Sequence, residues 1–282
     1  MTIIAACQLR LEVGQVDQNR SAAGEAVAQA AAGGARLIVL PELTPSGYCF
    51  TDLDEARTLA EPADGPTCQE WRDLSRRHHA VIVGGICESG PAGSVLNTSL
   101  VIDDGELVAT YRKVHLWDRE QLVFTPGDQP PAVVDTSIGR VATMICYDLE
   151  FPEWTRLAGL AGADVLAAPT NWPREARPAG ERPMEVVRVQ ASASVNRMFV
   201  VAADRCGTER SVDWVGGSVI VGPDGFPLAG PVAADEPAVL LADVDLTSAR
   251  DKRVSERNDA LADRRPDLYR GRTGEHHVPS AP

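Results

Sequence analysis

Glu42, Lys113 and Cys146 each follow closely on a short apolar or β-rich segment, and together they offer the parts of a nucleophilic site. In open α/β sheets, functional sites gather at the carboxyl ends of strands, so side chains in these positions can meet. A thiol becomes a useful nucleophile only as its thiolate, which forms when a base or a positive charge lies nearby. A carboxylate, an ammonium and a thiol therefore have complementary needs.

Each of the three residues also has an ordinary structural interpretation. A Glu that follows an apolar strand is usually solvated or caps a helix, a lone Lys is usually a surface charge, and a Cys at a strand end usually packs in the core. Position alone therefore does not identify a site, and the surrounding sequence must decide between the structural and the catalytic interpretation.

The segments that would position these residues alternate between strand and helix patterns. A continuous apolar run at 37–40 is typical of a strand buried on both faces, and the pair Gly33-Gly34 ends an Ala-rich helix before it. The turn at 103–105, Asp-Asp-Gly, predicts a β-hairpin. The predicted strands are 2–9, 37–40, 81–87, 95–102, 106–111, 140–145, 165–168, 199–204, 217–221 and 238–244, and the predicted helices are 17–32, 66–79, 152–161 and 185–196.

No linker composition interrupts this alternation, so we expect a single α/β domain over residues 1–282, although length alone favours two domains. Helical crossovers supply parallel strand pairs and the hairpin supplies an antiparallel pair, which predicts two mixed β-sheets with helices outside. The tail from about residue 245 has the pattern of a helix followed by an extended arm at 276–282. We expect this tail to pack on another element or on another subunit.

The composition excludes several classes of protein. With 40 acidic and 27 basic residues the net charge is −13, which makes nucleic acid and anionic membranes poor partners. The amino terminus has no basic region ahead of an apolar run, and no run approaches the roughly 18 apolar residues of a membrane span. The six cysteines form no CxxC pair, which favours reduced thiols in a cytoplasmic protein.

Three blocks of the sequence resemble the nitrilase superfamily of carbon–nitrogen hydrolases. They are PELTPSGY around Glu42, YRKVHLWDRE around Lys113 and ICYDLEFPE around Cys146, in the order and at the spacing of that family. The opening strand that ends in Gln8 and the segment RRPDLY at 264–269 are also similar, so the resemblance covers nearly the whole chain. It implies a four-layer αββα sandwich, a Glu–Lys–Cys triad, and subunits that pair sandwich to sandwich in a homodimer or higher homo-oligomer.

Carried over residue by residue, the resemblance assigns a role to each member of the triad. Cys146 corresponds to the nucleophile, Glu42 to the general base and Lys113 to the cation beside the oxyanion. A further carboxylate of the family, which holds substrate and triad in place, corresponds to Glu120, and the backbone N–H of Tyr147 corresponds to the second oxyanion donor. Such a mechanism passes through a cysteine thioester and needs no cofactor and no metal.

Aromatic and amide side chains lie in loops that would surround the triad. Trp117, Asn171 and Trp172 follow predicted strands, and Tyr48 lies in the loop after the strand at 37–40. Aromatic walls with one or two polar groups suit a small, partly apolar substrate. Residues 174–183 form a polar segment with Pro and Gly, which predicts either a loop that closes over the pocket or a plain surface loop.

The residues after Cys146 narrow the expected substrate. Many amidases that this chain resembles carry Arg where Glu150 stands, whereas versions with Glu resemble the branch that acts on amides of ω-amino acids and similar aliphatic amides. Nitrilases of the superfamily usually show a Trp-Glu pair after the cysteine, and N-carbamoyl hydrolases show other residues there. We therefore expect an amidase that converts a small aliphatic primary amide to carboxylic acid and ammonia, with an ω-amino or guanidino amide as one option.

Three alternatives stay open at this point. Glu150 can form a salt bridge outside the pocket instead of contacting a cationic substrate. The chain can be a nitrilase or an N-carbamoyl amino acid hydrolase with the same triad. It can also be a non-catalytic member that uses the fold for binding.

Several other residues have weaker claims to chemistry. The adjacent pairs His78-His79 and His276-His277 would not face one another on a helix, so no metal site is expected. We expect structural roles for the remaining candidates: hydrogen bonding for His115, packing for Cys49, and support of the nucleophile turn and the following helix for Asp148 and Glu153.

The choice of basic residues is itself informative. Only two of the 27 basic residues are Lys, namely Lys113 and Lys252. A compact ammonium fits beside a thiolate as a point charge, where the planar fork of Arg would not. The triad therefore explains why position 113 is Lys, whereas Lys252 receives no role.

Overall fold

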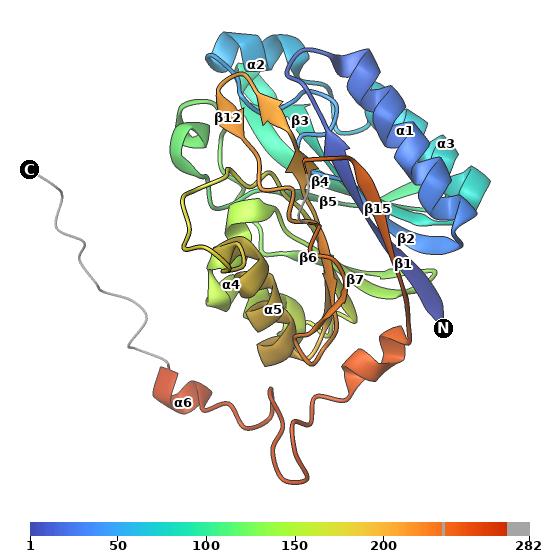
Figure 1. Cartoon of the computed structure of the whole chain (residues 1–282), viewed down its shortest axis with the longest axis vertical. Helices are drawn as coiled ribbons and strands as arrows, with labels where there is room; N and C mark the ends of the chain where they lie inside the picture. The colour runs from blue at the N-terminus through green and yellow to red at the C-terminus, as the bar shows by residue number, and fades with distance from the viewer. Residues whose placement is uncertain (233–234, 270–282) are drawn as a thin grey trace, which may run out of the picture. The chain divides into compact units, whose positions relative to one another are not determined.

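The computed structural model of the chain describes residues 1–232 and 235–269, and most of its strands belong to two mixed β-sheets (Figure 1). In the larger sheet the strand order is β10-β1-β2-β3-β4-β5, and β15 also pairs with β1. These strands are β1 (Thr2–Arg10), β2 (Ala35–Val39), β3 (Val81–Ser89), β4 (Val95–Asp103), β5 (Glu106–Arg112), β10 (Arg205–Cys206) and β15 (Ala238–Val244).

The smaller sheet has the strand order β14-β13-β9-β8-β7-β6. Its strands β7, β8 and β9 are parallel neighbours, and the outer pairs are antiparallel. They are β6 (Ala132–Thr136), β7 (Gly139–Thr143), β8 (Val165–Pro169), β9 (Phe199–Ala203), β13 (Val219–Val221) and β14 (Pro227–Ala229). A separate two-stranded sheet joins β11 (Thr208–Glu209) to β12 (Val212–Asp213).

Helices cover the outer face of each sheet. Figure 1 shows α1 and α3 outside the larger sheet and α4 and α5 outside the smaller one. The α-helices are α1 (Val16–Ala32), α2 (Leu53–Leu59), α3 (Pro66–His78), α4 (Pro152–Leu160), α5 (Met184–Asn196) and α6 (Pro266–Tyr269). The 3-10 turns are η1 (Pro91–Gly93), η2 (Asp118–Leu122), η3 (Cys146–Glu150) and η4 (Leu246–Arg250).

Alternation along the strands builds the layers, because successive side chains of a strand face opposite sides of the sheet. On β1, Ile4 and Ala6 pack with Val201 in the core between the two sheets. Ala5 and Cys7 of the same strand belong to a second core, shared with α1 and α3. A third core joins the smaller sheet to α4 and α5. The predicted four-layer αββα sandwich is confirmed.

The hairpin turn and the helix ends form where the sequence predicts them. Asp104 (φ 46°) and Gly105 (φ 80°) connect β4 to β5, and a two-residue hairpin turn of this kind needs positive φ at both positions. Helix α3 begins at Pro66 and ends where His79 adopts a left-handed conformation with φ 50°. Gly34 has φ 85° just after α1, where a side chain would be strained.

The structure differs from the sequence prediction in several elements. Strand β6, which pairs antiparallel with β7, was not predicted, and neither was α2, where the Asp52 carboxylate accepts a hydrogen bond from the Glu55 backbone N at 2.9 Å. The tail from about residue 245 does not form the single helix that was predicted ahead of the extended arm. The chain there makes only the short turn η4 and, much later, the four-residue helix α6.

Polar side chains explain the irregular course of this tail. Asp245 accepts a hydrogen bond from the Thr247 backbone N at 3.0 Å, and Asp259 Oδ1 accepts from the backbone N atoms of Leu261 and Ala262, each at 2.8 Å. Such local bonds compete with those of a continuous helix. The predicted arm at 276–282 lies outside the described residues.

Residues Met1–Asp251 form one compact unit, and the described residues from Lys252 to Tyr269 belong to a second, small unit. The packing of the tail on another element or subunit stays a prediction. Over 1–232 and 235–269, none of the helices combines the length and the apolar character that crossing a membrane requires.

Candidate active site

Cys146 lies shortly after β7, at the first residue of η3, and its backbone is in the left-handed region with φ 47°. This conformation is uncommon for a non-glycine residue, and backbone strain of this kind concentrates at functional sites. The side chain is 7% exposed, and its Sγ donates a hydrogen bond to the backbone oxygen of Asn171 at 3.6 Å. The turn therefore fixes the thiol at the carboxyl end of a central strand.

Asp148 holds the turn at the start of η3. Its Oδ2 accepts hydrogen bonds from the backbone N of Ile145 at 3.0 Å and from the hydroxyl of Tyr111 at 2.7 Å. Its Oδ1 accepts from the backbone N of His115 at 3.1 Å and lies 2.7 Å from His115 Nδ1. These bonds tie the turn after β7 to the end of β5 in the other sheet and to the loop that follows β5.

Lys113 joins two carboxylates in the interior. Its Nζ donates hydrogen bonds to Glu42 Oε1 at 2.8 Å and to Glu120 Oε1 at 2.7 Å, and all three side chains are buried. Glu42 Oε1 also accepts from Asn97 Nδ2 at 2.7 Å, and Glu120 Oε2 accepts from the Trp117 backbone N at 2.7 Å. The ends of β2 and β5 and the turn η2 thus bring three of the predicted residues together, with two carboxylates bound to one ammonium.

Burial, and the presence of two carboxylates beside one ammonium, determine the protonation states of Glu42 and Lys113. Burial is the main cause that raises the pKa of Glu42 to about 7, while the Lys113 ammonium lowers this pKa and the Glu120 carboxylate raises it further. For Lys113, burial acts to lower the pKa, but the charges of Glu120 and Glu42 outweigh it, so the pKa lies above the usual value for Lys. Lys113 therefore stays protonated, whereas Glu42 titrates near neutrality, in the range that suits a general base.

The same charges act on Cys146. Burial raises the pKa of its thiol well above the usual value, the Glu42 charge adds to this effect, and the Lys113 charge opposes it. The thiol at rest is therefore protonated, and it needs a base at the moment of attack. Within the described part of the chain, Glu42 Oε2 is buried and has no hydrogen-bond partner, so this oxygen is available to accept a proton.

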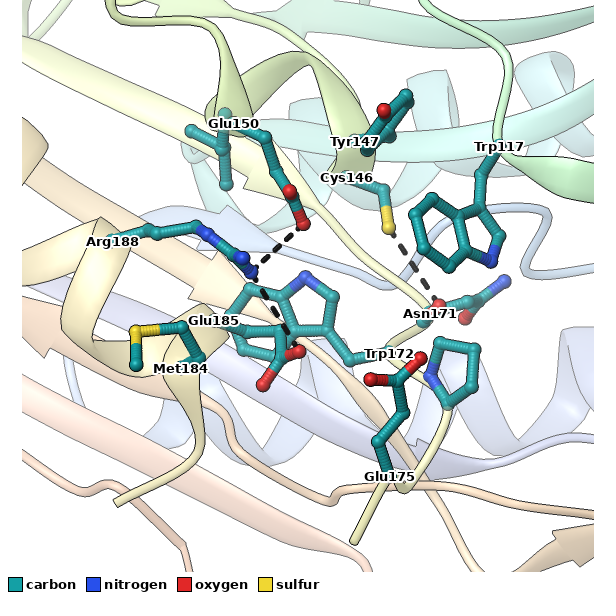
Figure 2. A pocket seen from close by; sticks show the side chains of 12 residues that line it. Trp117, Cys146, Tyr147, Glu150, Asn171, Trp172, Glu175, Met184, Glu185 and Arg188 are labelled. Atoms are coloured by element: carbon teal, nitrogen blue, oxygen red, sulfur yellow. Dashed lines mark hydrogen bonds and ion pairs between the residues drawn. The ribbon is translucent and has the colours of Figure 1, made fainter. Parts of the chain in front are cut away.

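A pocket of about 120 Å³ opens at Cys146 (Figure 2). The indole of Trp117 packs edge to face on the Tyr147 ring, with centroids 4.9 Å apart. Trp172 is part of the pocket wall, and its backbone N donates a hydrogen bond to Asp204 Oδ1 at 3.0 Å, which holds Trp172 in place. Five residues that the sequence predicted for substrate or oxyanion binding line the pocket: Trp117, Tyr147, Glu150, Asn171 and Trp172.

Glu150 lines this pocket and also forms a salt bridge. Its Oε1 lies 2.9 Å from Arg188 Nη1, and the same nitrogen lies 3.8 Å from Glu185 Oε1. Figure 2 shows Arg188 between these two carboxylates, on the opposite side of the pocket from Trp117. Burial raises the pKa of Glu150, and Arg188 opposes this shift. Glu150 therefore forms a salt bridge, but with a residue of the pocket wall and not outside the pocket, and its contact with a cationic substrate stays a prediction.

Tyr48 lies near the triad but not in this pocket. Its hydroxyl donates a hydrogen bond to Glu120 Oε1 at 2.8 Å. The residue lines a neighbouring cavity, and Trp117 forms part of the wall of both spaces. The structure thus places Tyr48 against Glu120 and not among the residues that line the pocket at Cys146.

Four residues of the site were missed by the sequence analysis. Asn97 binds Glu42, while Met184, Glu185 and Arg188 of α5 line the pocket. The spacing of Glu185 and Arg188 predicts that they share one face of a helix. No pattern in the sequence indicates that this face of α5 meets the turn η3.

The polar segment 174–183 borders the pocket at its first residues. Arg174 donates hydrogen bonds from Nε and Nη2 to the backbone oxygen of Trp214, at 3.2 and 2.9 Å, and forms an ion pair with Asp235. Glu175 lines the pocket. Closure of this segment over a substrate stays a prediction.

The remaining candidates have structural surroundings. Cys49 is half-buried, and its backbone N donates a hydrogen bond to Glu209 Oε2 at 2.7 Å. None of the six cysteines forms a disulfide. No group of three or more His, Cys, Asp or Glu side chains within 1–232 and 235–269 is arranged to hold a metal ion. The pair His276-His277 lies outside the described residues.

Comparison with known proteins places this chain in a family. The sequence model of the family described as carbon–nitrogen hydrolase matches residues 3–254. The chain is 35% identical to a protein named nitrilase from Pyrococcus abyssi, over 95% of this chain and 99% of that protein. It is 32% identical to the 2-oxoglutaramate amidase of Bacillus subtilis, over 83% of this chain and 87% of that protein.

The fold comparison agrees with the sequence comparison. The structure is similar to that of an amidase from Nesterenkonia sp. AN1, with a TM-score of 0.78 and 28% identity, over 96% of this chain and 99% of that chain. A mutant of that amidase shows the result of a Michael addition of acrylamide at its active-site cysteine.

Proposed function

Because this chain belongs to the carbon–nitrogen hydrolase family, which makes it an enzyme acting on amides, we propose that it hydrolyses a small aliphatic primary amide to a carboxylic acid and ammonia through a thioester on Cys146. The observation that carries this proposal is the Lys113 ammonium, held between Glu42 and Glu120 and acting electrostatically on the buried thiol. A relative and a structural neighbour that are named amidases favour this enzyme function over the non-catalytic alternative.

In the first half of the reaction, Glu42 takes the thiol proton as Cys146 Sγ attacks the amide carbon. The negative charge that develops on the amide oxygen is stabilised by the Lys113 ammonium and by the backbone N–H of Tyr147. Donors that are fixed in advance toward such an oxyanion contribute roughly 3 kcal/mol each. Because the triad is buried, these electrostatic interactions are weakly screened by water.

In the second half, the protonated Glu42 gives its proton to the leaving nitrogen. The carbon–nitrogen bond breaks, ammonia departs, and the acyl group remains on Cys146 as a thioester. Glu42 then takes a proton from water, the water oxygen attacks the thioester carbon, and the acid leaves as the thiol is restored.

An unpaired oxygen favours an amide over a nitrile as the substrate. Glu42 Oε2 is a buried acceptor without a partner among the described residues, and an amide nitrogen carries N–H groups that can satisfy it. A nitrile nitrogen has no N–H group, so a nitrile substrate would offer no donor to this oxygen and only the Cys146 thiol could supply one. A site built to accept a hydrogen bond from its substrate discriminates strongly against analogues that lack the donor.

The pocket supports a small substrate. A space of about 120 Å³ lined by Trp117, Trp172 and Met184 suits a short aliphatic chain. The option of an ω-amino or guanidino group is supported by the charge of the pocket wall, which holds three carboxylates, those of Glu150, Glu175 and Glu185, and the one cation Arg188 between two of them. Equal turnover of neutral and cationic amides of matched length would remove this option.

One alternative reaction keeps specific support. A relative that is 35% identical over 95% of this chain is named nitrilase, so a nitrile is the second candidate substrate. The decisive experiment is ammonia release from a panel of aliphatic amides, ω-amino amides, nitriles and N-carbamoyl amino acids. We expect the amides to react fastest. Faster release from nitriles or N-carbamoyl amino acids would overturn the amidase assignment.

A matched control belongs to this panel. Cys146→Ala removes only the thiol from a folded chain, so we expect no ammonia release by this variant from any substrate. Retained release would exclude the thioester route, whichever substrate is the best.

The proposal extends to a homo-oligomer. Helices α4 and α5 cover the smaller sheet, yet Leu157, Leu160, Val187 and Val195 on these helices are each 39 to 49% exposed. Apolar side chains of this kind are typical of surfaces that associate. Light scattering after gel filtration would test for a homodimer or a larger assembly. Six cysteines without a disulfide support a cytoplasmic location for this assembly.

A further inference from the structure

Among the described residues, Arg205 and Glu209 form a fully buried ion pair that the proposed reaction does not use. Arg205 Nη2 lies 2.8 Å from Glu209 Oε1, and Arg205 Nη1 donates to Glu209 Oε2 at 3.1 Å. The two side chains are 0% and 1% exposed, and neither lines the pocket at Cys146. Burying such a pair costs desolvation energy that the attraction barely offsets, so an apolar pair of similar size would often stabilise the fold as well. Stability alone therefore does not explain it.

The pair anchors the backbone of the segment that carries Tyr48. Glu209 Oε2 accepts hydrogen bonds from the backbone N atoms of Tyr48 at 3.1 Å and Cys49 at 2.7 Å. Gly47 just before them has φ 77°, and a Cβ there would lie 2.6 Å from Glu209 Oε1 and 2.3 Å from the backbone of Val13. The segment thus passes too close to Glu209 and Val13 for any side chain at position 47.

An aromatic contact fixes the side chain of Tyr48 from the same direction. Its ring packs edge to face on Trp214, with centroids 5.3 Å apart and planes at 83°. The Arg205 guanidinium lies over the Trp214 ring, 4.5 Å from its centroid. Arg205, Glu209 and Trp214 therefore constrain both the backbone and the ring of Tyr48.

The constrained hydroxyl of Tyr48 meets the triad at one atom. Glu120 Oε1 accepts the Tyr48 hydroxyl at 2.8 Å and the Lys113 ammonium at 2.7 Å. Burial and the nearby charges of Glu120, Glu42 and Cys146 raise the pKa of Tyr48, so its hydroxyl remains a donor. Glu120 Oε1 therefore accepts hydrogen bonds from two donors, the Tyr48 hydroxyl and the Lys113 ammonium.

We propose that Tyr48 is a positioning residue for the amidase reaction and that the buried Arg205–Glu209 pair, with Trp214, holds it there. By donating to Glu120 Oε1, Tyr48 keeps the Lys113 ammonium shared between Glu120 and Glu42, in the place where it meets the oxyanion. This inference rests on the proposed function, and it assigns a purpose to a buried ion pair about 160 residues away from Tyr48 in the sequence.

Tyr48→Phe tests the first half of this inference, because it removes one hydroxyl and leaves the ring contact with Trp214. We expect kcat to fall by about 10- to 100-fold, as for the loss of a hydrogen bond to a charged group, with KM changed by less than about twofold. Lys113 would then be drawn toward Glu120 and away from Glu42, so the acid limb of kcat/KM should move to higher pH. An unchanged kcat and an unchanged limb would overturn the role of Tyr48.

The double variant Arg205→Met/Glu209→Met tests the second half. We expect it to lower kcat as Tyr48→Phe does, and to add less than about twofold to the loss when it is combined with Tyr48→Phe, because coupled residues are not additive. If the combined variant loses kcat by the product of the two separate losses, the ion pair acts independently of Tyr48. The matched control Arg20→Met/Glu70→Met removes a pair between α1 and α3 and should leave kcat unchanged.

A readout without turnover separates this inference from the proposed function. The rate at which iodoacetamide alkylates Cys146 depends on thiolate formation, so it should fall about 10-fold in Tyr48→Phe whatever the natural substrate is. A wild-type chain that releases no ammonia from any amide, with alkylation still slowed in the variant, would refute the amidase assignment alone. Normal wild-type turnover with equal alkylation rates would refute the positioning role alone.

Discussion

Two regions of the active site contain the same types of charge in different surroundings. The lysine cluster consists of Glu42, Lys113 and Glu120, and the arginine cluster consists of Glu150, Glu185 and Arg188. Side chains of the lysine cluster are at most 3% exposed, whereas those of the arginine cluster are 20 to 36% exposed. In both clusters one cation lies between two carboxylates.

The difference in exposure indicates what each cluster can do. Water and salt screen charges near the surface, so a half-exposed ion pair contributes little energy and adapts easily to a new partner. A buried pair is weakly screened, and removing or displacing one partner is costly. The lysine cluster is therefore suited to stabilise charge during bond breaking, and the arginine cluster is suited to select among substrates.

The largest effect is expected from Lys113→Arg, which conserves the charge but not its shape. A guanidinium is larger and planar, so it cannot occupy the position between Glu42 and Glu120. We expect kcat to fall by about 10²- to 10³-fold, comparable to the loss of one oxyanion donor. The rate of ammonia release measures this loss.

Lys252→Arg is the matched control, since it makes the same exchange at the other lysine of the chain. It should leave kcat within about twofold of the wild type, as surface substitutions away from special features usually do. Equal losses for both variants would mean that the buried position of Lys113 has no special importance.

A smaller effect is expected from Glu120→Gln, which keeps the shape and removes the charge. The Lys113 ammonium would lose one ionic partner, and we expect kcat to fall by about 10- to 100-fold. Because the Glu120 charge raises the pKa of Glu42, its removal should move the acid limb of the pH profile to lower pH. A limb that moves upward would contradict this arrangement of charges.

The pH profile of the wild type tests whether Glu42 of the lysine cluster acts as the base. Glu42 must be ionised to accept the thiol proton, and its pKa is raised to about 7, so kcat/KM should rise with pH through this region. The apparent value belongs to the coupled cluster and not to one residue. Initial rates between pH 5 and 9 measure the limb, and activity that stays constant from pH 5 upward would exclude Glu42 as the base.

The smallest effect is expected in the arginine cluster. Glu150→Gln removes one half-exposed carboxylate from the wall of the pocket, so KM for a cationic amide should rise by about two- to fivefold with kcat nearly unchanged. KM for a neutral amide of the same length should not change. The control Glu106→Gln removes a carboxylate that pairs with Arg72 on another face.

A loss of kcat in Glu150→Gln as large as that in Glu120→Gln would remove the distinction between the two clusters. It would place the Glu150–Arg188 pair in the chemical step and not in substrate selection. Steady-state kinetics with one neutral and one cationic amide is sufficient for this comparison.

Local patterns predict much of the fold, and the resemblance of the sequence motifs to the nitrilase superfamily predicts the lysine cluster. Glu42, Lys113 and Cys146 each follow a short strand within a contiguous motif, so the ends of the strands and the side chains they carry could be recognised together. The order of strands and helices also follows from local patterns. Strand β6 was missed because its burial is only partial and its pattern is weak.

The arginine cluster and the support of Tyr48 could not be predicted in the same way. Arg188 meets Glu150 across 38 positions of sequence, and Glu209 meets the backbone of Tyr48 across 161. Such contacts depend on how separate elements pack, which neither periodicity nor turn signals indicate. The same reason explains why Asn97, an ordinary polar residue within a strand, gave no sign that it binds Glu42.

The central claim is that amide hydrolysis passes through an acyl group on Cys146. Rapid quenching in acid during turnover of the best amide, followed by mass spectrometry of the digested chain, measures this directly. We predict that the peptide containing Cys146 gains the mass of the acyl group, and that this gain disappears as the substrate is consumed. Ammonia release with no acyl mass on Cys146 at any time during turnover would contradict the account.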